Sequence, residues 1–225
     1  NHLFGTDWLG RDMLNRTIKG LSFSMFVGII ASSLSAIMAL LIGTAAALLP
    51  RWVDDICNWL IDLVMGIPHL ILLILISFAL GRGVLGVTAG IALTHWPSLA
   101  RIIRAEVLQL RQEDYLHIAR HLGKSNYYLL QKHILPHILP QFLTGLILLF
   151  PHAILHEAAI TFLGFGLSPE TPAVGIILSE SMRYLSSGYW YLAFFPGFTL
   201  LTVVYLFDRL GHFLQNLYDP YHAQD

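Results

Sequence analysis

The feature that most constrains this chain is an uninterrupted apolar run from Leu21 to Leu49, which spans 29 residues without one charged side chain. A helix of about 20 mostly apolar residues is long enough to cross a hydrocarbon layer about 30 Å thick. The composition agrees, because 56% of the residues are hydrophobic and only 12% are charged. The run therefore predicts an integral membrane protein.

Five apolar segments are expected to form membrane helices, because a helix satisfies its own backbone hydrogen bonds in lipid. None of them alternates apolar and polar residues with the period of two that barrel strands require. The predicted fold class is therefore all-α, a polytopic transmembrane helical bundle. The five expected helices are 21–49, 59–80, 84–99, 138–162 and 191–207.

Several other classes of protein are excluded by the composition. The formal net charge is −1, so the chain lacks the basic footprint of a nucleic-acid-binding protein. The single cysteine, Cys57, rules out an internal disulfide and a multi-cysteine zinc site. No G-x-x-x-x-G-K-[ST] motif is present, so nothing in the sequence is expected to cradle the phosphates of ATP.

The distribution of Lys and Arg predicts the orientation, since cytoplasmic loops carry the excess of positive charge. Five alternating helices place eight positive residues on one side and five on the other. The expected division is an extracytoplasmic segment 1–20, a transmembrane domain 21–210 with a cytoplasmic loop 101–136, and a cytoplasmic tail 211–225. An outside N-terminus without a preceding span leads us to expect a further helix before Asn1. The eight are Arg51, Arg101, Arg104, Arg111, Arg120, Lys124, Lys132 and Arg209, and the five are Arg11, Arg16, Lys19, Arg82 and Arg183.

The cytoplasmic loop contains a polar insert, Glu113 to Pro136, between two apolar runs. Its apolar residues recur at spacings of three and four, which predicts a short amphipathic helix. Gly123 is placed to end that helix, a second helix is expected near Ser125, and Pro136 marks the start of the next span. Such a helix suits docking into a groove on a soluble partner, and the alternative is a loop that packs on its own bundle. The apolar positions are Tyr115, Leu116, Ile118, Ala119 and Leu122.

The spacing of Ala119, Gly123, Leu135 and Pro136 resembles the coupling loop of ABC-importer permeases, whose pattern is Glu-Ala-Ala, three residues, Gly, nine residues, Ile-x-Leu-Pro. His117 and Ile118 replace the Glu and the first Ala, and His133 replaces the Ile. These departures are similar to those of the dipeptide, oligopeptide and nickel permease subfamily.

Four other stretches resemble that subfamily, in the same order along the chain. Relative to it, the first transmembrane helix is absent. The stretches are FGTDWLGRD at 4–12, WLIDLVMGIP at 59–68, FLGFGLSPETPAVG at 162–175 and Asp219-Pro220.

The resemblance implies a multi-pass permease subunit of an ATP-driven importer in the bacterial cytoplasmic (inner) membrane, and not an enzyme. The implied partners are a second homologous permease, two ATP-binding subunits and an extracytoplasmic solute-binding protein, with membrane lipid around them and no nucleic acid. ATP and Mg would be bound by the ATPase, and no cofactor by this chain. The residues implied to couple to the ATPase are Tyr115, Ile118, Ala119, Leu122, Gly123, Leu135 and Pro136.

His152, His156 and Glu157 form the most unusual polar group, because they lie in the outward half of an apolar helix. Ionisable groups there are costly unless they face protein or a water-filled cavity. One interpretation is that the histidines border the translocation pathway while Glu157 orients an imidazole as an acceptor. The other is a satisfied polar cluster that supports the following loop.

Other polar residues are interpreted as structural. The i,i+4 pairs His117/His121 and His133/His137 have a spacing that can hold a metal, but they lie in or beside the polar loop, and no metal site is predicted there. Asp62 is expected at the cytoplasmic membrane edge and Pro68 is expected to bend its helix. The alternative is that these two residues line a pathway. Trp96-Pro97 is expected to anchor a helix end.

Peptides, nickel and metal chelates are the cargo classes compatible with these motifs. The 11 histidines favour a metal or metallophore, with di- or oligopeptide import as the alternative. Two other functions remain open on the residues alone. One is an intramembrane metal-dependent hydrolase that uses His152, His156 and Glu157, and the other is a stand-alone channel, which would leave the coupling loop without a purpose.

Overall fold

The computed structural model of the chain describes residues 2–218, which form a helical bundle. Within these residues the only β-structure is one isolated bridge between Thr6 and Asp12. The predicted all-α class is confirmed. The helices in chain order are α1 (Met13–Leu48), α2 (Arg51–Gly66), α3 (His69–Ala79), α4 (Val84–Leu110), α5 (Asp114–His121), α6 (Asn126–Leu129), a π-helical turn (Leu130–Ile134), α7 (Leu135–Phe162), α8 (Val174–Met182), a 3₁₀ turn (Leu185–Ser187) and α9 (Tyr191–Tyr218).

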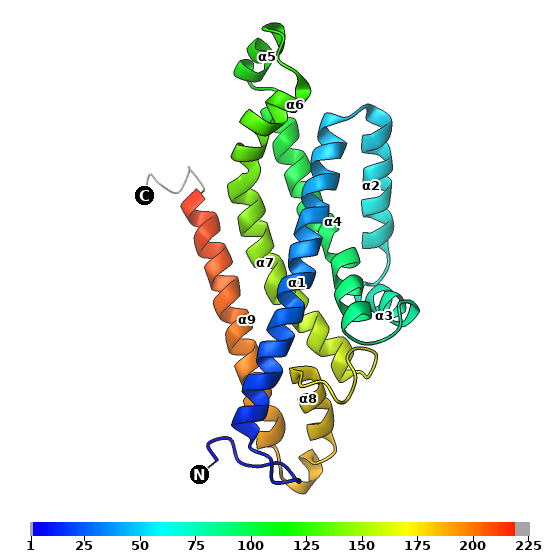
Figure 1. Cartoon of the computed structure of the whole chain (residues 1–225), viewed down its shortest axis with the longest axis vertical. Coiled ribbons are helices and arrows are strands. Elements are labelled where there is room, and N and C mark those ends of the chain that lie inside the picture. Colours follow the sequence, from blue (N-terminus) through cyan, green and yellow to red (C-terminus); the bar gives the residue numbers. More distant parts are fainter. Residues whose placement is uncertain (1, 219–225) are drawn as a thin grey trace.

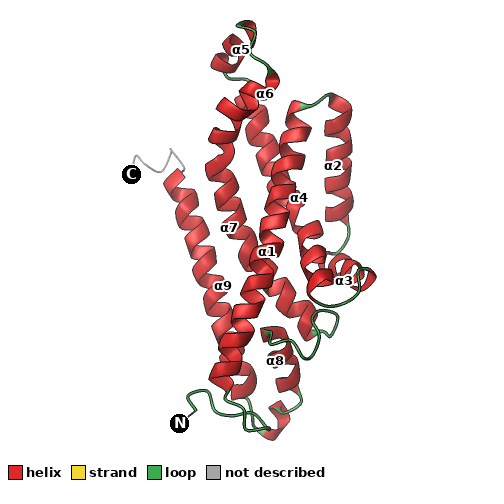
Figure 2. Ribbon diagram, in the orientation of Figure 1, coloured by secondary structure: helices red, strands yellow, loops and turns green. Residues whose placement is uncertain are grey.

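The long helices α1, α4, α7 and α9 run along the long axis of the molecule (Figures 1 and 2). Helix α1 packs most extensively on α4 and also lies against α7. Its buried face carries small residues such as Ser32, Ala36 and Gly43, which allow two backbones to approach closely in a membrane. A Cβ atom added at Gly43 would lie 2.7 Å from the carbonyl oxygen of Ala100, so this crossing has no room for a side chain.

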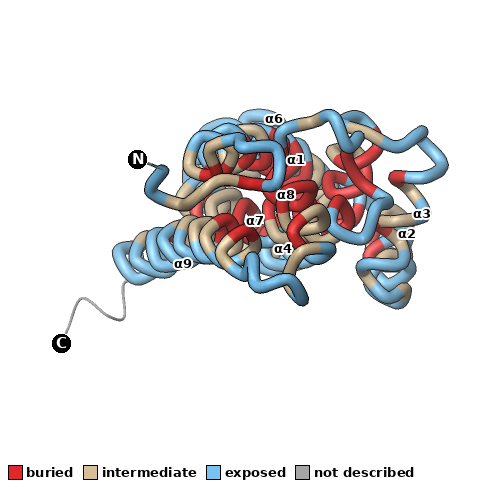
Figure 3. The backbone as a smooth tube through the Cα atoms, turned by 90° about the horizontal axis from the view of Figure 1, so that it is seen from below, coloured by how far each residue is buried: buried red, intermediate tan, exposed pale blue. Residues whose placement is uncertain are grey.

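Three helical stretches are long and apolar enough to cross a membrane, namely Met13–Leu48, Tyr127–Phe162 and Tyr191–Leu217, and the bent pair α2–α3 would make a fourth. With α4 they correspond to the five expected segments. Helix α9 lies at the side of the bundle and is mostly exposed (Figure 3), as expected for a helix that faces lipid or a neighbouring subunit. Residues 211–218 of the predicted tail form the end of α9, whereas the predicted motif Asp219-Pro220 and the residues after it lie outside the described residues.

The segment 59–80 was predicted as one helix and is instead two, with α2 and α3 bent by 98° relative to each other. The break falls at Pro68, the N-cap residue of α3, because proline has no N–H to continue the hydrogen bonds of the preceding helix. The predicted bend at Pro68 is thus confirmed, although it is a break rather than a kink. Asp62 is exposed on α2 and forms an ion pair with Arg101 of α4.

The expected role of Trp96-Pro97 as a helix-end anchor is wrong. Helix α4 continues past the predicted end at Leu99 to Leu110, so both residues lie buried inside it. The extension stays in the bundle because its arginines find carboxylates on α2: Arg104 Nε lies 2.6 Å from Asp54 Oδ1. The charges that suggested a loop are therefore paired within the bundle.

The N-terminal segment 2–12, called the hook below, folds compactly at the end of the molecule opposite α5 (Figure 1). Asp7 is its centre: the backbone N–H groups of Leu9 and Arg11 each donate to Oδ1 at 2.9 Å, and Oδ2 accepts from Arg11 Nε at 2.7 Å and from Arg16 Nη1 at 2.9 Å. Arg16 also reaches Glu180 of α8 at 2.7 Å. Asp12 caps α1 by accepting from Asn15 N. The stretch 4–12 is therefore built to join the start of α1 to α8.

Candidate functional site

The coupling insert forms a small unit that projects beyond the bundle at one end (Figure 1). Helix α5 runs from Asp114 to His121, close to the predicted helix 115–123. Gly123 ends it with a φ of 77°, a left-handed conformation that glycine adopts without strain. Lys124 N then donates to Ala119 O at 3.1 Å and Gly123 N to Arg120 O at 2.9 Å, which closes the C-terminus of the helix.

The apolar residues of α5 divide between two environments. Leu116 is fully buried and Ala119 packs beside it against the main core cluster. Tyr115, Ile118 and Leu122 are instead 43%, 58% and 73% exposed. One side of α5 thus packs on its own bundle, as the alternative interpretation expected. Docking on a partner stays a prediction, for which three apolar side chains are exposed.

The insert is joined directly to α7, because residues Tyr127 to Phe162 form one continuous helical stretch. Leu135 and Pro136 are the first two residues of α7, so Pro136 lies inside that stretch and not at a break. The ring of His133 lies 5.8 Å from that of Tyr115 and 6.0 Å from that of Tyr128. A residue that departs from the expected coupling pattern thus packs between the two short helices.

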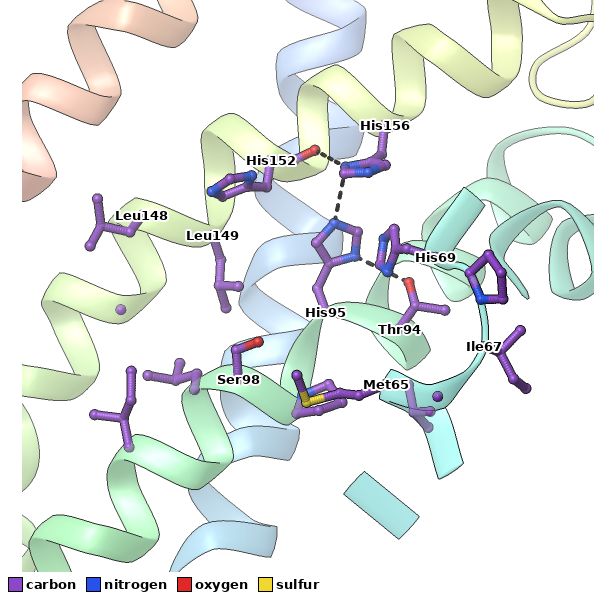
Figure 4. Close-up of a pocket in the computed structure, with 17 residues that line it drawn as sticks. Met65, Ile67, His69, Thr94, His95, Ser98, Leu148, Leu149, His152 and His156 are labelled. Atoms are coloured by element: carbon purple, nitrogen blue, oxygen red, sulfur yellow. Dashed lines mark hydrogen bonds between the residues drawn. The ribbon is translucent and has the colours of Figure 1, made fainter. Parts of the chain in front are cut away.

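A cavity of about 740 Å³ lies between the α2–α3 bend, α4 and α7 (Figure 4). Its lining is mostly apolar, with Ser98, Thr94 and four histidines as the polar exceptions. The histidines come from three elements: His69 from α3, His95 from α4, and His152 and His156 from α7. Among the described residues, the lining contains no Asp, Glu, Lys or Arg, so imidazoles and hydroxyls supply its side-chain chemistry.

Three of the four rings converge (Figure 4). Ring centroids of His69 lie 4.5 Å from those of His95 and His156, and the latter two are 5.0 Å apart. His95 is held by a contact of 2.9 Å between its Nδ1 and the carbonyl oxygen of Ile91. His156 Nδ1 lies 2.8 Å from the carbonyl oxygen of His152 and 3.4 Å from His95 Nε2.

The structure separates the three residues that the sequence grouped on α7. His152 and His156 both line the cavity, but the ring of His152 is directed away from the other three histidines (Figure 4). Glu157 is fully buried and accepts a hydrogen bond of 3.0 Å from Thr161. It therefore supports the helix end before the following loop. The predicted contact of Glu157 with an imidazole is not formed, because its carboxylate is bonded to Thr161 instead.

His69 and His95 were not identified from the sequence. Each is a lone histidine in an apolar segment, which is the one signal that could have pointed to them. Their partners lie 26 to 87 residues away along the chain, so spacing within one helix could not have revealed the cluster.

Residues 39–219 match the family model described as binding-protein-dependent transport system inner membrane component. The chain is 31% identical over 220 residues to the dipeptide transport system permease protein DppC of Bacillus subtilis, covering 98% of this chain and 69% of that protein. It is 33% identical over 219 residues to the DppC of Alkalihalophilus pseudofirmus, covering 97% and 72%.

Solved structures share the fold. One is the MetNI methionine ABC transporter in inward-facing conformations, with a TM-score of 0.73, 17% identity, and coverage of 92% of this chain and 98% of that one. Another is an amino acid ABC transporter, with a TM-score of 0.58, 21% identity, and coverage of 87% and 94%.

Proposed function

The chain belongs to the family of binding-protein-dependent transport system inner membrane components, and from that premise we propose that its cargo is a di- or oligopeptide. The chain is a permease subunit of an ABC importer and a multi-pass protein of the inner membrane. It is a transporter subunit and not an enzyme, since ATP hydrolysis in such importers belongs to partner proteins.

The observation that carries the peptide proposal is the name shared by its relatives, dipeptide transport system permease protein. The preference for a metal or metallophore, which the histidine content suggested, is not supported by these relatives, and the peptide alternative fits better. The intramembrane hydrolase loses its proposed constellation as well, because Glu157 hydrogen bonds to Thr161 on the same helix.

We assign the cavity between α2–α3, α4 and α7 to the cargo pathway. A volume of about 740 Å³ falls within the range of roughly 300–1,000 Å³ typical of small-molecule pockets. Its apolar lining suits side chains of varied shape, while imidazoles and hydroxyls can form hydrogen bonds with peptide groups. Such contacts stay weak, which lets a cargo leave as readily as it arrives.

The coupling unit is proposed to receive the ATPase on Tyr115, Ile118 and Leu122, whose side chains are exposed on α5. Because Tyr127 to Phe162 is one continuous helical stretch, a displacement of α5–α6 is carried along α7 to His152 and His156. Gly123 ends α5, and Leu135 and Pro136 begin α7, so these three residues set the geometry of the connection. Binding of the ATPase at α5 then changes the free energy of cargo binding at the cavity.

The assembly proposed for this subunit contains a second homologous permease, two ATP-binding subunits and an extracytoplasmic solute-binding protein. ATP and Mg²⁺ belong to the ATP-binding subunits, because this sequence has no phosphate-binding loop of the G-x-x-x-x-G-K-[ST] type.

The test is uptake by proteoliposomes that contain the complete importer with its binding protein. We expect ATP-dependent accumulation of a labelled di- or oligopeptide, which falls more than tenfold when Gly123 is replaced by Glu. Free Ni²⁺ and a Ni²⁺ chelate, tested in parallel, should not accumulate. Uptake of the nickel species without any peptide uptake would contradict the proposed cargo.

A further inference from the structure

The three converging histidines offer more than a polar lining for the cavity. One nitrogen from each of His69, His95 and His156 can be chosen so that all three lie within 4.8 Å of one another. The rings come from α3, α4 and α7, three elements that the chain brings together only through folding. Three inward-facing imidazoles on separate elements are a ligand set of the kind that holds a transition metal ion.

The ring of His95 is already oriented as a ligand. Its Nδ1 lies 2.9 Å from the carbonyl oxygen of Ile91, so this nitrogen carries the proton and donates. Nε2 is left with a lone pair directed at the other two rings. A backbone carbonyl that fixes the tautomer and orientation in this way is a usual support for a metal-bound histidine.

The ring of His69 supplies a second free nitrogen. Its Nε2 is buried, and no hydrogen-bond partner for it is found within residues 2–218. A buried polar atom without a partner is costly, and an ion would satisfy its lone pair. His69 also directly follows Pro68 at the α2–α3 break, so its position depends on the bend.

The distances are close to those of a metal site. Two nitrogens bound at about 2.0–2.1 Å to one tetrahedral ion lie about 3.4 Å apart. His95 Nε2 and His156 Nδ1 are 3.4 Å apart. The three ligand atoms lie within 4.8 Å of one another, a limit larger than 3.4 Å, so ion binding is expected to draw the rings inward. His156 Nδ1 lies 2.8 Å from the carbonyl oxygen of His152 and so carries the proton in this structure. Ion binding at Nδ1 therefore requires the other tautomer of His156, with the proton on Nε2, and breaks the contact with His152.

The chemistry of the lining selects the class of ion. No carboxylate of residues 2–218 lines the cavity, which disfavours Mg²⁺ and Ca²⁺ because they prefer oxygen ligands. Neutral imidazoles suit Zn²⁺, Ni²⁺ and Cu²⁺. The fourth position of a tetrahedral ion faces the cavity, where water can complete the coordination.

We propose that His69, His95 and His156 form a binding site for a divalent transition metal ion that ties α3, α4 and α7 together. The ion is a ligand of the permease and not its cargo. Because it binds only where the three rings converge, it stabilises this arrangement of the helices over any arrangement in which they separate. Bound Zn²⁺ therefore slows a transport cycle that moves these helices apart.

The first test measures binding without transport. The purified importer complex, carrying no polyhistidine tag, is stripped with a chelator and titrated with Co²⁺, whose absorption bands report tetrahedral nitrogen ligation, and then with Zn²⁺ in competition. We expect one site per copy of this subunit that His69→Ala, His95→Ala and His156→Ala each weaken at least 100-fold. The matched control is His212→Ala, an exposed histidine near the far end of α9, which should leave the site unchanged.

Folding is controlled separately, since His95 is buried. Thermal unfolding of each chelator-treated variant is compared with that of the wild type, and His95→Asn serves as a polar replacement of smaller volume. If every folded variant binds Co²⁺ as the wild type does, or if the wild type shows no site, the cluster is a polar network without an ion and the proposal is wrong.

The second test uses the ratio of peptide uptake with and without Zn²⁺ in proteoliposomes. Zn²⁺ should lower wild-type uptake severalfold, a chelator should restore it, and the ratio should return to one in His69→Ala. Zn²⁺ that binds the trio without changing uptake would refute the tethering of the helices. The binding titration needs no transported peptide, so its result is independent of the cargo proposed above.

Discussion

The two ends of this permease differ in how far their side chains are paired within the chain. At the N-terminal end, Asp7 is buried and receives two arginine side chains and two backbone N–H groups. At the other end, α5 leaves Ile118 and Leu122 more than half exposed. The polar groups of the N-terminal segment are paired within the chain, whereas the coupling unit leaves an apolar surface exposed.

This difference separates residues that stabilise the fold from residues that are proposed to bind the ATPase. A closed set of charged hydrogen bonds contributes to stability only while every partner is present. An exposed apolar side chain contributes little to the stability of its own chain but gains free energy when a partner buries it. Variants at the hook should therefore change unfolding, and variants at the coupling unit should change activity.

The largest expected effect on stability comes from Asp7→Asn. The change removes the charge that Arg11 and Arg16 share, and a buried ion pair that loses one partner typically costs about 3–5 kcal/mol. Arg11 is partly exposed, so we expect a loss near the lower value, about 3 kcal/mol. Thermal unfolding of the purified complex should start several degrees lower, while uptake per folded complex stays close to that of the wild type.

The pH dependence of unfolding provides the control. Burial alone would raise the pKa of Asp7, but the hydrogen bonds and charges of Arg11 and the N–H of Leu9 outweigh it and hold the pKa below its ordinary value of 3.8. The stabilisation is thus complete above pH 3.8 and is lost as the pH falls through the lower folded pKa. The difference in unfolding free energy between the wild type and Asp7→Asn should therefore decrease as the pH falls from 3.8 towards the lower folded pKa. A gap that stays constant down to pH 3 would show that the charge of Asp7 is not the cause.

Much of this contrast could be predicted from the sequence. The apolar runs give the long helices, and the spacing of Tyr115, Ile118 and Leu122 gives α5 nearly to the residue. The sequence failed where tertiary pairing overrides composition. Arg101 and Arg104 suggested the end of a helix, but Asp62 and Asp54 on α2 neutralise them and α4 continues.

The site was only partly predictable, for a related reason. His152 and His156 stood out because they share one helix with a spacing of four. His69 and His95 join His156 only after the α2–α3 bend turns α3 against α4, and that bend depends on a break of two residues. Glu157, adjacent to His156 in the sequence, turns to Thr161 because the two side chains lie four residues apart on the helix.

Gly123→Glu should have the next largest effect, seen in transport rather than in stability. Gly123 has a φ of 77° and open space around its Cα, so the new side chain projects into the region where the ATPase is proposed to dock. We expect uptake, basal ATPase activity and cargo-stimulated ATPase activity to fall more than tenfold with membrane insertion unchanged.

A matched glycine exists at the other end. Gly10 has a φ of 74° and equally open space, so Gly10→Glu carries the same backbone strain of about 1 kcal/mol without facing the ATPase. Its effect on basal ATPase activity, measured without the binding protein, should be small. Equal losses of basal activity in both variants would attribute the Gly123 effect to strain and remove the support for coupling.

The smallest expected effects come from a pair of mild truncations, Ile118→Ala and Tyr191→Phe, which divide the two roles most finely. Ile118 is 58% exposed, so its truncation should change the unfolding free energy by less than about 0.5 kcal/mol. If a partner buries it, the lost apolar area corresponds to about 1 kcal/mol, or roughly fivefold weaker association with the ATPase subunits.

Tyr191 donates a hydrogen bond of 2.9 Å to the carbonyl oxygen of Thr6, and its loss should cost about 1 kcal/mol of stability with no change in association. Thermal unfolding and a pull-down of ATPase subunits, run on both variants, give a two-by-two comparison. If Ile118→Ala binds its ATPase as tightly as the wild type, the exposed side of α5 is not the docking surface. A partner docked there would bury Ile118 and would therefore lose contact area on its truncation.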